Sequence, residues 1–274
     1  MHNQKGMALV IVLWITVVLT SITAAAAYLT RLETKQSHYP ARDMQLIGAS
    51  IAGLERVKSE LKEDNKYTYN SLKGKWKNGY DSYTKIGDIE ISLLVEDEES
   101  KLNLNTANKE DLHKYPPFIN YANSDRLIKS LTVPIDCLDD LVIINNIADN
   151  KQIQTIKNTA TVNSTGKINI NTAPVEVLMA LPGIDYTLAQ AIIARRNGKD
   201  LLQATEDDLP YDNIMKVELV TGREIYKKIV NLITVKSSFF KVTIKTSYGK
   251  YSKIIESVLS RQGNNIHISY WREL

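Results

Sequence analysis

The sequence predicts an α+β fold: a long N-terminal helix packed on a small antiparallel sheet, with an all-α domain inserted between the strands. Three observations lead to this prediction. An apolar run continues into an amphipathic helical pattern, alternating segments flank a long helical block, and that block contains an internal repeat. With 274 residues, 43% of them hydrophobic, the chain is long enough for an anchor and two soluble lobes.

The apolar run occupies residues 7–29, and the first charged residue after it is Arg31. A helix of roughly 23 residues is about 34 Å long, which exceeds the ~30 Å hydrocarbon core of a bilayer. A helix also satisfies its own backbone polar groups, so lipid tolerates it. We therefore expect this segment to span a membrane. The small residues Ala24 to Ala27 leave a cleaved signal peptide as an alternative.

The helical pattern continues after the span, with apolar residues at three- and four-residue steps along one stripe. These residues are Met44, Ile47, Ile51, Leu54, Val57 and Leu61. Such spacing predicts an amphipathic helix that buries one face. Pro40 should kink this helix or disfavour its first turn.

A half-buried strand is predicted at 89–95, preceded by a loop at 64–87 that is rich in Lys, Asn, Tyr and Gly. Four acidic residues follow the strand: Glu96, Asp97, Glu98 and Glu99. Carboxylates are ligands that Ca²⁺ prefers, which makes calcium a candidate. Four consecutive side chains do not point at one centre, however, so we favour a solvated acidic turn and expect no cofactor.

The helical block contains one motif twice. KLNLNTANKEDL begins at Lys101, and KININTAPVEVL begins at Lys167. Each copy predicts a short extended piece with two inward apolar residues, followed by Thr106 or Thr172 as the cap of a new helix. After the second copy, Pro182-Gly183 separates two apolar helical stretches, which predicts a helix-hairpin-helix unit.

A helix-hairpin-helix unit raises the question of DNA binding. In modules that hold DNA, hairpin amides meet a phosphate, typically with a second glycine two places after the first. Here Asp185 stands two places after Gly183, and its carboxylate would repel phosphate. Arg195, Arg196 and Lys199 lie about three turns away. We therefore expect no nucleic acid, and the net charge of +3 does not imply one.

The end of the chain, residues 237–274, predicts an antiparallel meander. Alternating segments around 240–245, 253–261 and 266–271 are joined by short turns at Ser247–Lys250 and Gln262–Asn265. We find no Ser/His/Asp set, no paired metal ligands and no phosphate loop, and the single cysteine, Cys137, suits a small buried site. The protein is therefore not expected to be an enzyme.

The Lys5-Gly6 step directly before the apolar run resembles the processing site of type IV pilins and type II secretion pseudopilins. In those families a membrane peptidase cuts after the glycine and methylates the new amino terminus, here Met7. Most pilins carry Glu at the fifth mature position, which here is Ile11. That carboxylate is thought to pair with a neighbour's terminal ammonium inside the filament. A subunit with isoleucine there suits the filament tip.

The missing Glu, DEESKLNLNTA, ININTAPVEVL and the ending SSFFKVTIKTSYGKYSK through ISYWREL together resemble the K-type minor pseudopilins of the type II (general) secretion system. The resemblance implies a pilin-like fold with a leader at 1–6, a transmembrane helix at 7–29, a body at 30–95 and 237–274, and an inserted domain at 96–236. The helical block is shorter than is usual in that family, particularly before Pro134.

The resemblance also implies a role: initiating or capping a short pseudopilus for protein export. It implies a single pass through the cytoplasmic (inner) membrane with the body on the periplasmic side. Expected partners are the other minor pseudopilins, the major pseudopilin, the prepilin peptidase and the inner-membrane assembly platform. The stripe from Met44 to Leu61 is the expected binding face. Two alternatives stay open: a competence-type, membrane-anchored DNA receptor, and a minor pilin of a related type IV pilus.

Overall fold

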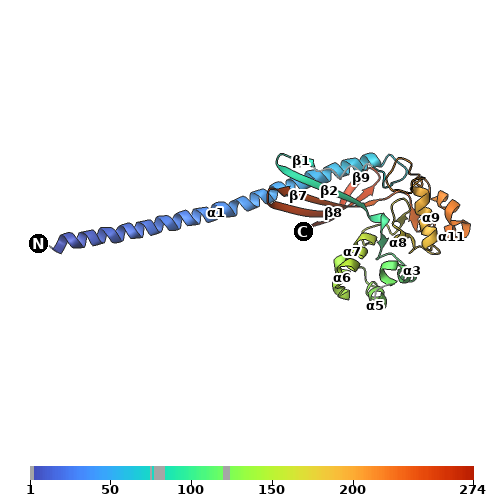
Figure 1. The fold of residues 1–274 in the computed structure, drawn as a ribbon, viewed down its shortest axis with the longest axis horizontal. Helices are drawn as coiled ribbons and strands as arrows, with labels where there is room; N and C mark the ends of the chain where they lie inside the picture. The colour runs from blue at the N-terminus through green and yellow to red at the C-terminus, as the bar shows by residue number, and fades with distance from the viewer. Residues whose placement is uncertain (1–2, 75, 77–83, 120–123) are drawn as a thin grey trace.

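The computed structural model describes residues 3–74, 76, 84–119 and 124–274. Helix α1 extends from Asn3 to Asp64 without interruption, and Pro40 does not end it. Its first half projects away from the rest of the molecule, and its second half lies along a sheet (Figure 1). The structure therefore confirms the prediction that the apolar run continues into an amphipathic helix.

The sheet has five strands in the order β1-β2-β7-β8-β9, and every neighbouring pair is antiparallel. The strands are β1 (Thr84–Ile86), β2 (Ile89–Asp97), β7 (Phe239–Tyr248), β8 (Tyr251–Gln262) and β9 (Asn265–Glu273). The strand before the helical block and the three after it are as predicted. Strand β1 was not predicted: it falls at the end of the expected loop and forms a hairpin with β2.

The second half of α1 buries one face against this sheet, and the predicted stripe is divided between two environments. Leu54, Val57 and Leu61 are fully buried in one core with apolar residues of β2, β7 and β8. Met44 is 74% exposed and Ile51 47% exposed. The expectation that the whole stripe binds a partner is thus wrong for the three buried residues, because the chain's own sheet covers them.

Close contact between helix and sheet depends on one glycine. A Cβ added at Gly53 would lie 3.1 Å from Leu93 Cδ2 and 3.3 Å from Ile91 Cγ2. These contacts are tighter than packed interiors usually contain, so a side chain here would push α1 away from β2. A larger residue at 53 would disturb the body core.

The inserted lobe leaves the sheet at the end of β2 and returns at the start of β7. Its first half contains η1 (Glu98–Ser100), β3 (Leu102–Asn103), α3 (Lys109–Lys114), α4 (Pro116–Ile119), α5 (Ser124–Ser130), α6 (Leu138–Asn145), α7 (Asn150–Thr159) and β4 (Ala160–Thr161). Its second half contains β5 (Ile168–Asn169), α8 (Val175–Leu178), α9 (Tyr186–Arg196), η2 (Ile214–Val217), α10 (Glu218–Thr221), α11 (Arg223–Ile229) and β6 (Ile233–Thr234).

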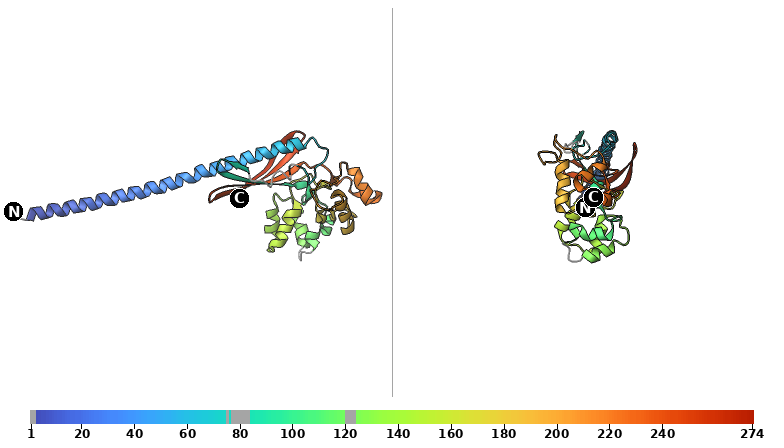
Figure 2. Two further views of the ribbon diagram at one scale, coloured as in Figure 1. Left: turned by 45° about the horizontal axis from the view of Figure 1, so that its top comes forward. Right: turned by 90° about the vertical axis from the view of Figure 1, so that its right-hand side faces the viewer.

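The lobe is not purely helical, which differs from the predicted all-α domain. Strand β3 pairs in parallel with β4, and β5 pairs in parallel with β6. Each short pair ties the start of one half of the lobe to its end. Figures 1 and 2 show the lobe at the end of the body away from the free end of α1. Strand β2 extends to Asp97, one residue beyond the expected start of the insert at 96.

Candidate functional site

The projecting part of α1 is the first candidate surface. Residues Leu9–Thr30 form the one described helix segment that is long and apolar enough to cross a membrane, and none of it is buried by the rest of the chain. Its hydroxyl groups do not remain unpaired: Thr16, Thr20 and Thr23 each donate to a carbonyl one turn back. Such a surface suits lipid or other apolar helices as its surroundings.

The predicted processing residues and the missing-Glu position lie on this segment. Gly6 is within α1, and the Met7 side chain is 64% exposed. Ile11 is 53% exposed and lies in the segment that no described part of the chain buries. The projecting helix therefore carries no carboxylate between Met7 and Thr30 that could neutralise a neighbour's ammonium.

The acidic run at the end of β2 and the start of η1 is a buried joint between body and lobe, so the expectation of a solvated turn is wrong. Asp97, Glu98 and Glu99 are 4%, 4% and 1% exposed, and only Glu96 is partly open. Besides local partners, these carboxylates accept hydrogen bonds from residues 63 to 140 positions further along the chain. Donors from both halves of the lobe converge on these carboxylates.

Asp97 accepts hydrogen bonds from the second half of the lobe and from the segment before β7. Thr172 Oγ1 and Ser237 Oγ each donate at 2.6 Å, and Asn169 Nδ2 donates at 3.1 Å. Asp97 also caps the short helix η1 by accepting from the Glu99 amide at 2.9 Å. Burial raises the pKa of the Asp97 carboxyl, although each of these hydrogen bonds opposes that change.

Glu98 and Glu99 point to other partners. Glu98 accepts from Lys101 Nζ at 2.8 Å and from the Thr161 hydroxyl, which belongs to the first half of the lobe. Glu99 accepts from Thr165 Oγ1 at 2.7 Å and from the Ser238 amide. Burial, and next the charge of Asp97, raise the pKa of Glu99 to about 7.

This arrangement does not favour the weaker calcium expectation for Glu96 to Glu99. Protein donors already occupy oxygens of Asp97, Glu98 and Glu99, and Glu96 pairs with Lys101 and Lys241, each at 3.3 Å. Within the described part of the chain, no group of three or more His, Cys, Asp or Glu side chains could hold a metal ion.

The repeated motif forms two closely similar turns. In the first copy, Asn103 accepts from the Asn105 amide at 2.9 Å, and Asn105 brackets the backbone of Ile135 with bonds of 2.9 and 3.0 Å. In the second copy, Asn169 accepts from the Asn171 amide at 3.0 Å. Asn171 then brackets Tyr211, by accepting from its amide at 2.7 Å and donating to its carbonyl at 2.9 Å.

The threonine of each copy is not a helix cap, which corrects the prediction for Thr106 and Thr172. Helix α3 is capped by Asn108, and α8 begins after Pro174. Each threonine instead donates weakly to the carbonyl three residues before it, at 3.4 Å for Thr106 and 3.5 Å for Thr172. The turn is longer than expected, so each helix begins two residues later than predicted.

The predicted hairpin between α8 and α9 is present, with Gly183 at φ +82°. Asp185 caps α9 by accepting from the Leu188 amide at 2.8 Å. Arg196 is buried and donates to the carbonyls of Ile170 and Ala173 at 2.7 and 2.8 Å. These two charged residues therefore serve the lobe itself: one satisfies the helix terminus, and the other holds the second-copy turn.

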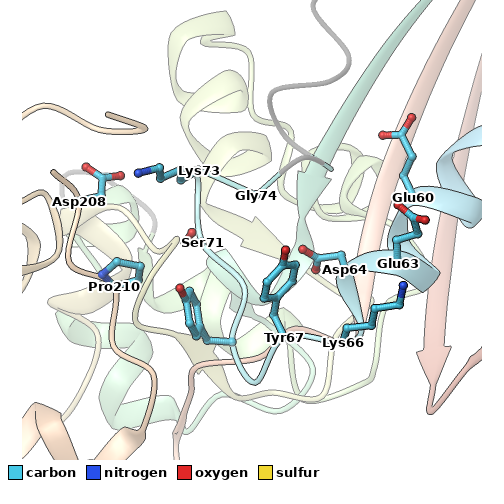
Figure 3. Close-up of a pocket in the computed structure, with 11 residues that line it drawn as sticks. Glu60, Glu63, Asp64, Lys66, Tyr67, Ser71, Lys73, Gly74, Asp208 and Pro210 are labelled. Atoms are coloured by element: carbon cyan, nitrogen blue, oxygen red, sulfur yellow. The ribbon is translucent and has the colours of Figure 1, made fainter. Parts of the chain in front are cut away.

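A cavity of about 530 Å³ lies between the end of α1 and the second half of the lobe (Figure 3). Figure 3 shows the Tyr67 hydroxyl directed towards Asp64, with Lys73 facing Asp208 on the opposite wall. Asp64 pairs with Arg261 at 3.4 Å, and burial raises the Asp64 pKa. The described lining contains no His or Cys, and we assign no chemistry to it.

Arg261 was missed by sequence reasoning and links the end of α1, the loop that follows it and the segment before β7. It is buried in β8 and donates to Asn70 Oδ1 at 2.6 Å, to the Leu61 carbonyl at 3.4 Å and to the Ser237 carbonyl. Its guanidinium carbon also lies 5.0 Å from the centre of the Phe240 ring. The sequence did contain a signal for a buried arginine, because Arg261 directly follows the apolar stretch of β8.

Two comparisons find similarity to known proteins. Residues 163–207 match the family model of the helix-hairpin-helix motif. The whole fold is similar to GspK in the crystal structure of the GspK-GspI-GspJ complex from the type 2 secretion system of enterotoxigenic Escherichia coli. That match has a TM-score of 0.68 at 12% identity, and it covers 87% of this chain and 99% of that one. No curated protein sequence matches the chain. The predicted pilin-like fold with a helical insert is therefore confirmed.

Proposed function

We propose that this chain is a minor pseudopilin of the K type, a non-enzymatic subunit of a type II secretion pseudopilus. The observation that carries the proposal is the whole architecture: an exposed apolar helix continues into a pilin-like body that carries a large lobe between β2 and β7. The structural match to GspK in the solved complex covers 99% of that chain and 87% of this one. The solved chain is named in complex with GspI and GspJ, which supports corresponding minor pseudopilins as partners here.

The proposed place of the subunit is the tip of the pseudopilus, where it initiates or caps assembly. Two features support this position. The lobe extends beyond the end of the body that is far from the span, where the next subunit of a filament would have to stack (Figure 1). Ile11 provides no carboxylate for the ammonium of a neighbouring subunit, and an unpaired buried charge costs several kcal/mol.

The proposed life cycle begins in the cytoplasmic membrane, with the body on the periplasmic side. The prepilin peptidase cuts between Gly6 and Met7 and methylates Met7, and the inner-membrane assembly platform then extracts the subunit. The exposed residues Met44 and Ile51 remain available as contacts for other minor pseudopilins or the major pseudopilin. Leu54 and its buried neighbours contribute only to the chain's own core.

Processing is tested by Gly6→Ala, which should block cleavage and leave the full-length chain in the membrane. Mass spectrometry of the native protein should find methylated Met7 at the amino terminus. A mature chain that begins near Ala26 or Ala27 would instead support the signal-peptide alternative.

The tip position is tested by Ile11→Glu, with Ile11→Val as the matched control. At the tip an added carboxylate finds no ammonium, so Ile11→Glu should not improve incorporation. Cross-linking to the other pseudopilins and labelling along isolated filaments provide the measurement. Label distributed regularly along the shaft would contradict the tip position but not the fold.

The helix-hairpin-helix match favours one second candidate, the competence-type DNA receptor. Asp185 argues against it, because its carboxylate occupies the start of α9, where a phosphate would need to bind. The full chain in detergent should therefore show no salt-sensitive binding to duplex DNA. A dissociation constant below about 10⁻⁶ M at physiological salt would reverse this ranking. The neighbouring genes would distinguish a secretion system from a type IV pilus.

A further inference from the structure

The end of the body nearest the span contains a cluster of cations and tyrosines. The β7–β8 turn lies there, with Gly249 at φ +56° between the two strands. The Arg42 guanidinium lies 5.7 Å from the centre of the Tyr248 ring and 4.9 Å from that of Tyr251, and Lys250 Nζ lies 5.5 Å from the Tyr251 ring centre. We call this group the basal cluster, and we include Lys245, which is exposed on the opposite face of β7 near the same end. Cation–π contacts hold its charges without neutralising them.

Most acidic residues at this end are held in ion pairs. Lys253 pairs with Asp43 at 2.7 Å and with Glu273 at 2.9 Å, so two acids share one lysine and the group keeps one net negative charge. Lys85 and Glu90 likewise pair at 2.8 Å. Within the described part of the chain, Lys245 is exposed and has no acidic partner.

With the paired groups included, the charges at this end are close to balanced, with a small positive excess. The five positive charges belong to Arg42, Lys85, Lys245, Lys250 and Lys253, and the four negative ones to Asp43, Asp88, Glu90 and Glu273. The sequence between the span and the body, residues 31–41, adds two basic residues, Arg31 and Lys35, and one acidic residue, Glu33. Together these residues carry seven positive charges and five negative ones in the sequence. The excess is small, but Arg42, Lys245 and Lys250 have no acidic partner within the described part of the chain, so these three cations can meet external anions.

The distance to the membrane follows from the unbroken helix. Arg42 lies twelve residues beyond Thr30, the end of the span. At ~1.5 Å per residue this is about 18 Å, and the headgroup layer occupies roughly 5 to 8 Å of it. An upright helix would leave about 10 Å, close to the ~8 Å Debye length at physiological salt. Membrane helices tilt by about 20° on average, and tilt towards the sheet lowers the turn further.

We propose that the basal cluster rests on the anionic lipid headgroups of the membrane that α1 crosses. The inference rests on the proposed membrane anchoring. Contact with the headgroups would hold the body at a fixed tilt relative to the bilayer before assembly. Lys245 and Lys250 supply charge that is free to pair with lipid phosphate, and the tyrosines suit the water–lipid interface.

The test measures the distance from the turn to the lipid in the full chain. Cys137→Ser with Ser252→Cys places one fluorescent donor beside the turn, on an exposed residue. The labelled chain is reconstituted in vesicles of phosphatidylcholine and in vesicles that also contain phosphatidylglycerol, both with acceptor lipids. Energy transfer should be higher in the anionic vesicles. The difference should disappear at about 1 M salt, where the Debye length falls to ~3 Å.

Matched variants separate this contact from a general effect of charge. Lys245→Glu with Lys250→Glu should reduce transfer in anionic vesicles to the phosphatidylcholine value. Lys227→Glu with Lys228→Glu makes the same charge change on α11, in the distal lobe, and should leave transfer unchanged. Asp88→Lys should raise it.

Two outcomes would overturn the inference, and they differ in what else they affect. Equal transfer in both kinds of vesicle, from a chain that resists alkaline carbonate extraction, would reject the headgroup contact but keep the anchor. A chain that carbonate extracts would contradict the membrane anchor and the proposed function with it.

Discussion

The two copies of the repeat share one turn but occupy different surroundings. In both copies the first asparagine closes the turn and the second binds a distant backbone residue through both its amide and its carbonyl. In both halves of the lobe, a parallel strand pair joins the start of that half to its end. In the second copy, Asn169 and Thr172 also donate to Asp97 of the body. In the first copy, Asn103 donates to the Ser164 carbonyl within the lobe, and Thr106 is exposed.

This difference indicates that the residues shared by both copies form the turn itself. The burial of each copy determines whether its side chains also contact the body. Asn171 is 3% exposed, while its counterpart Asn105 lies on the surface. The second copy is thus the main attachment of the lobe to Asp97. The first copy meets the acidic joint through Lys101, which pairs with Glu98, and β4 adds the hydrogen bond from Thr161 to Glu98. Matched substitutions at equivalent positions can test this assignment.

The largest effect is expected for Asp97→Ala, because Asp97 is the acceptor to which the second copy binds. The change leaves the hydroxyls of Thr172 and Ser237 and the amide of Asn169 without their acceptor. We expect a loss of about 3 to 5 kcal/mol in the free energy of unfolding, since each orphaned buried donor costs about 1 to 3 kcal/mol. Urea unfolding of the full chain in detergent measures it, with the exposed Asp88→Ala as control. Similar losses for both variants would contradict the role of Asp97.

The next effect concerns pH, through Glu99, which contacts the linker between the copies. Its folded pKa of about 7 lies above the ordinary value of 4.5, so the folded state binds the proton more tightly. Its contribution to stability is complete below about pH 4.5 and is lost as pH rises through 7. The loss is about 3 kcal/mol at ~1.36 kcal/mol per unit. Glu99→Gln should flatten this part of the pH profile, and parallel profiles would argue against it.

A smaller effect should separate the two bracketing asparagines. Asn171→Ala removes both bonds to the Tyr211 backbone in a buried site and should cost about 2 to 3 kcal/mol. Asn105→Ala removes the same pair of bonds to Ile135 on the surface, where water can replace them, and should cost about 1 kcal/mol. Denaturant midpoints of the two variants give the comparison. Equal costs would show that burial does not distinguish the copies.

The smallest effect is expected for the two threonines. Thr172→Val removes one donor to Asp97 and should cost about 1 to 2 kcal/mol. Thr106→Val changes an exposed hydroxyl with a single weak bond and should stay within about 0.5 kcal/mol. Thermal unfolding of both variants resolves the difference. A larger loss of stability for Thr106→Val than for Thr172→Val would contradict the assignment of the second copy as the main attachment of the lobe.

Helices and strands long enough to repeat their apolar spacing several times were predictable from the sequence. The stripe on α1 and the alternation in β2, β7, β8 and β9 depend on local spacing, which burial of one face imposes. The two copies of the repeat were also recognisable, because equal turns require equal residues. Strand pairs β3–β4 and β5–β6 were not predicted, since a strand of two residues shows no period.

The joint could not be predicted, because its partners are distant in the chain. Asp97 and Thr172 are 75 residues apart, and Glu98 and Thr161 are 63 apart. A run of acids is normally solvated, and only hydrogen-bond donors brought in by the fold make its burial tolerable. For the same reason the stripe on α1 could be located without knowing which of its residues the sheet would cover.

The direct pairing of β2 with β7 has a consequence for the order of folding. Asp97 lies opposite Phe240, so these partners are 143 residues apart in sequence. Closing an unfolded loop of this length costs about 3 kcal/mol more in chain entropy than closing one of about five residues. A lobe that has already folded holds its two ends together and removes most of that cost. We therefore expect the lobe to form first. A slow lobe would leave β2 and β7 as open edges on which chains can aggregate.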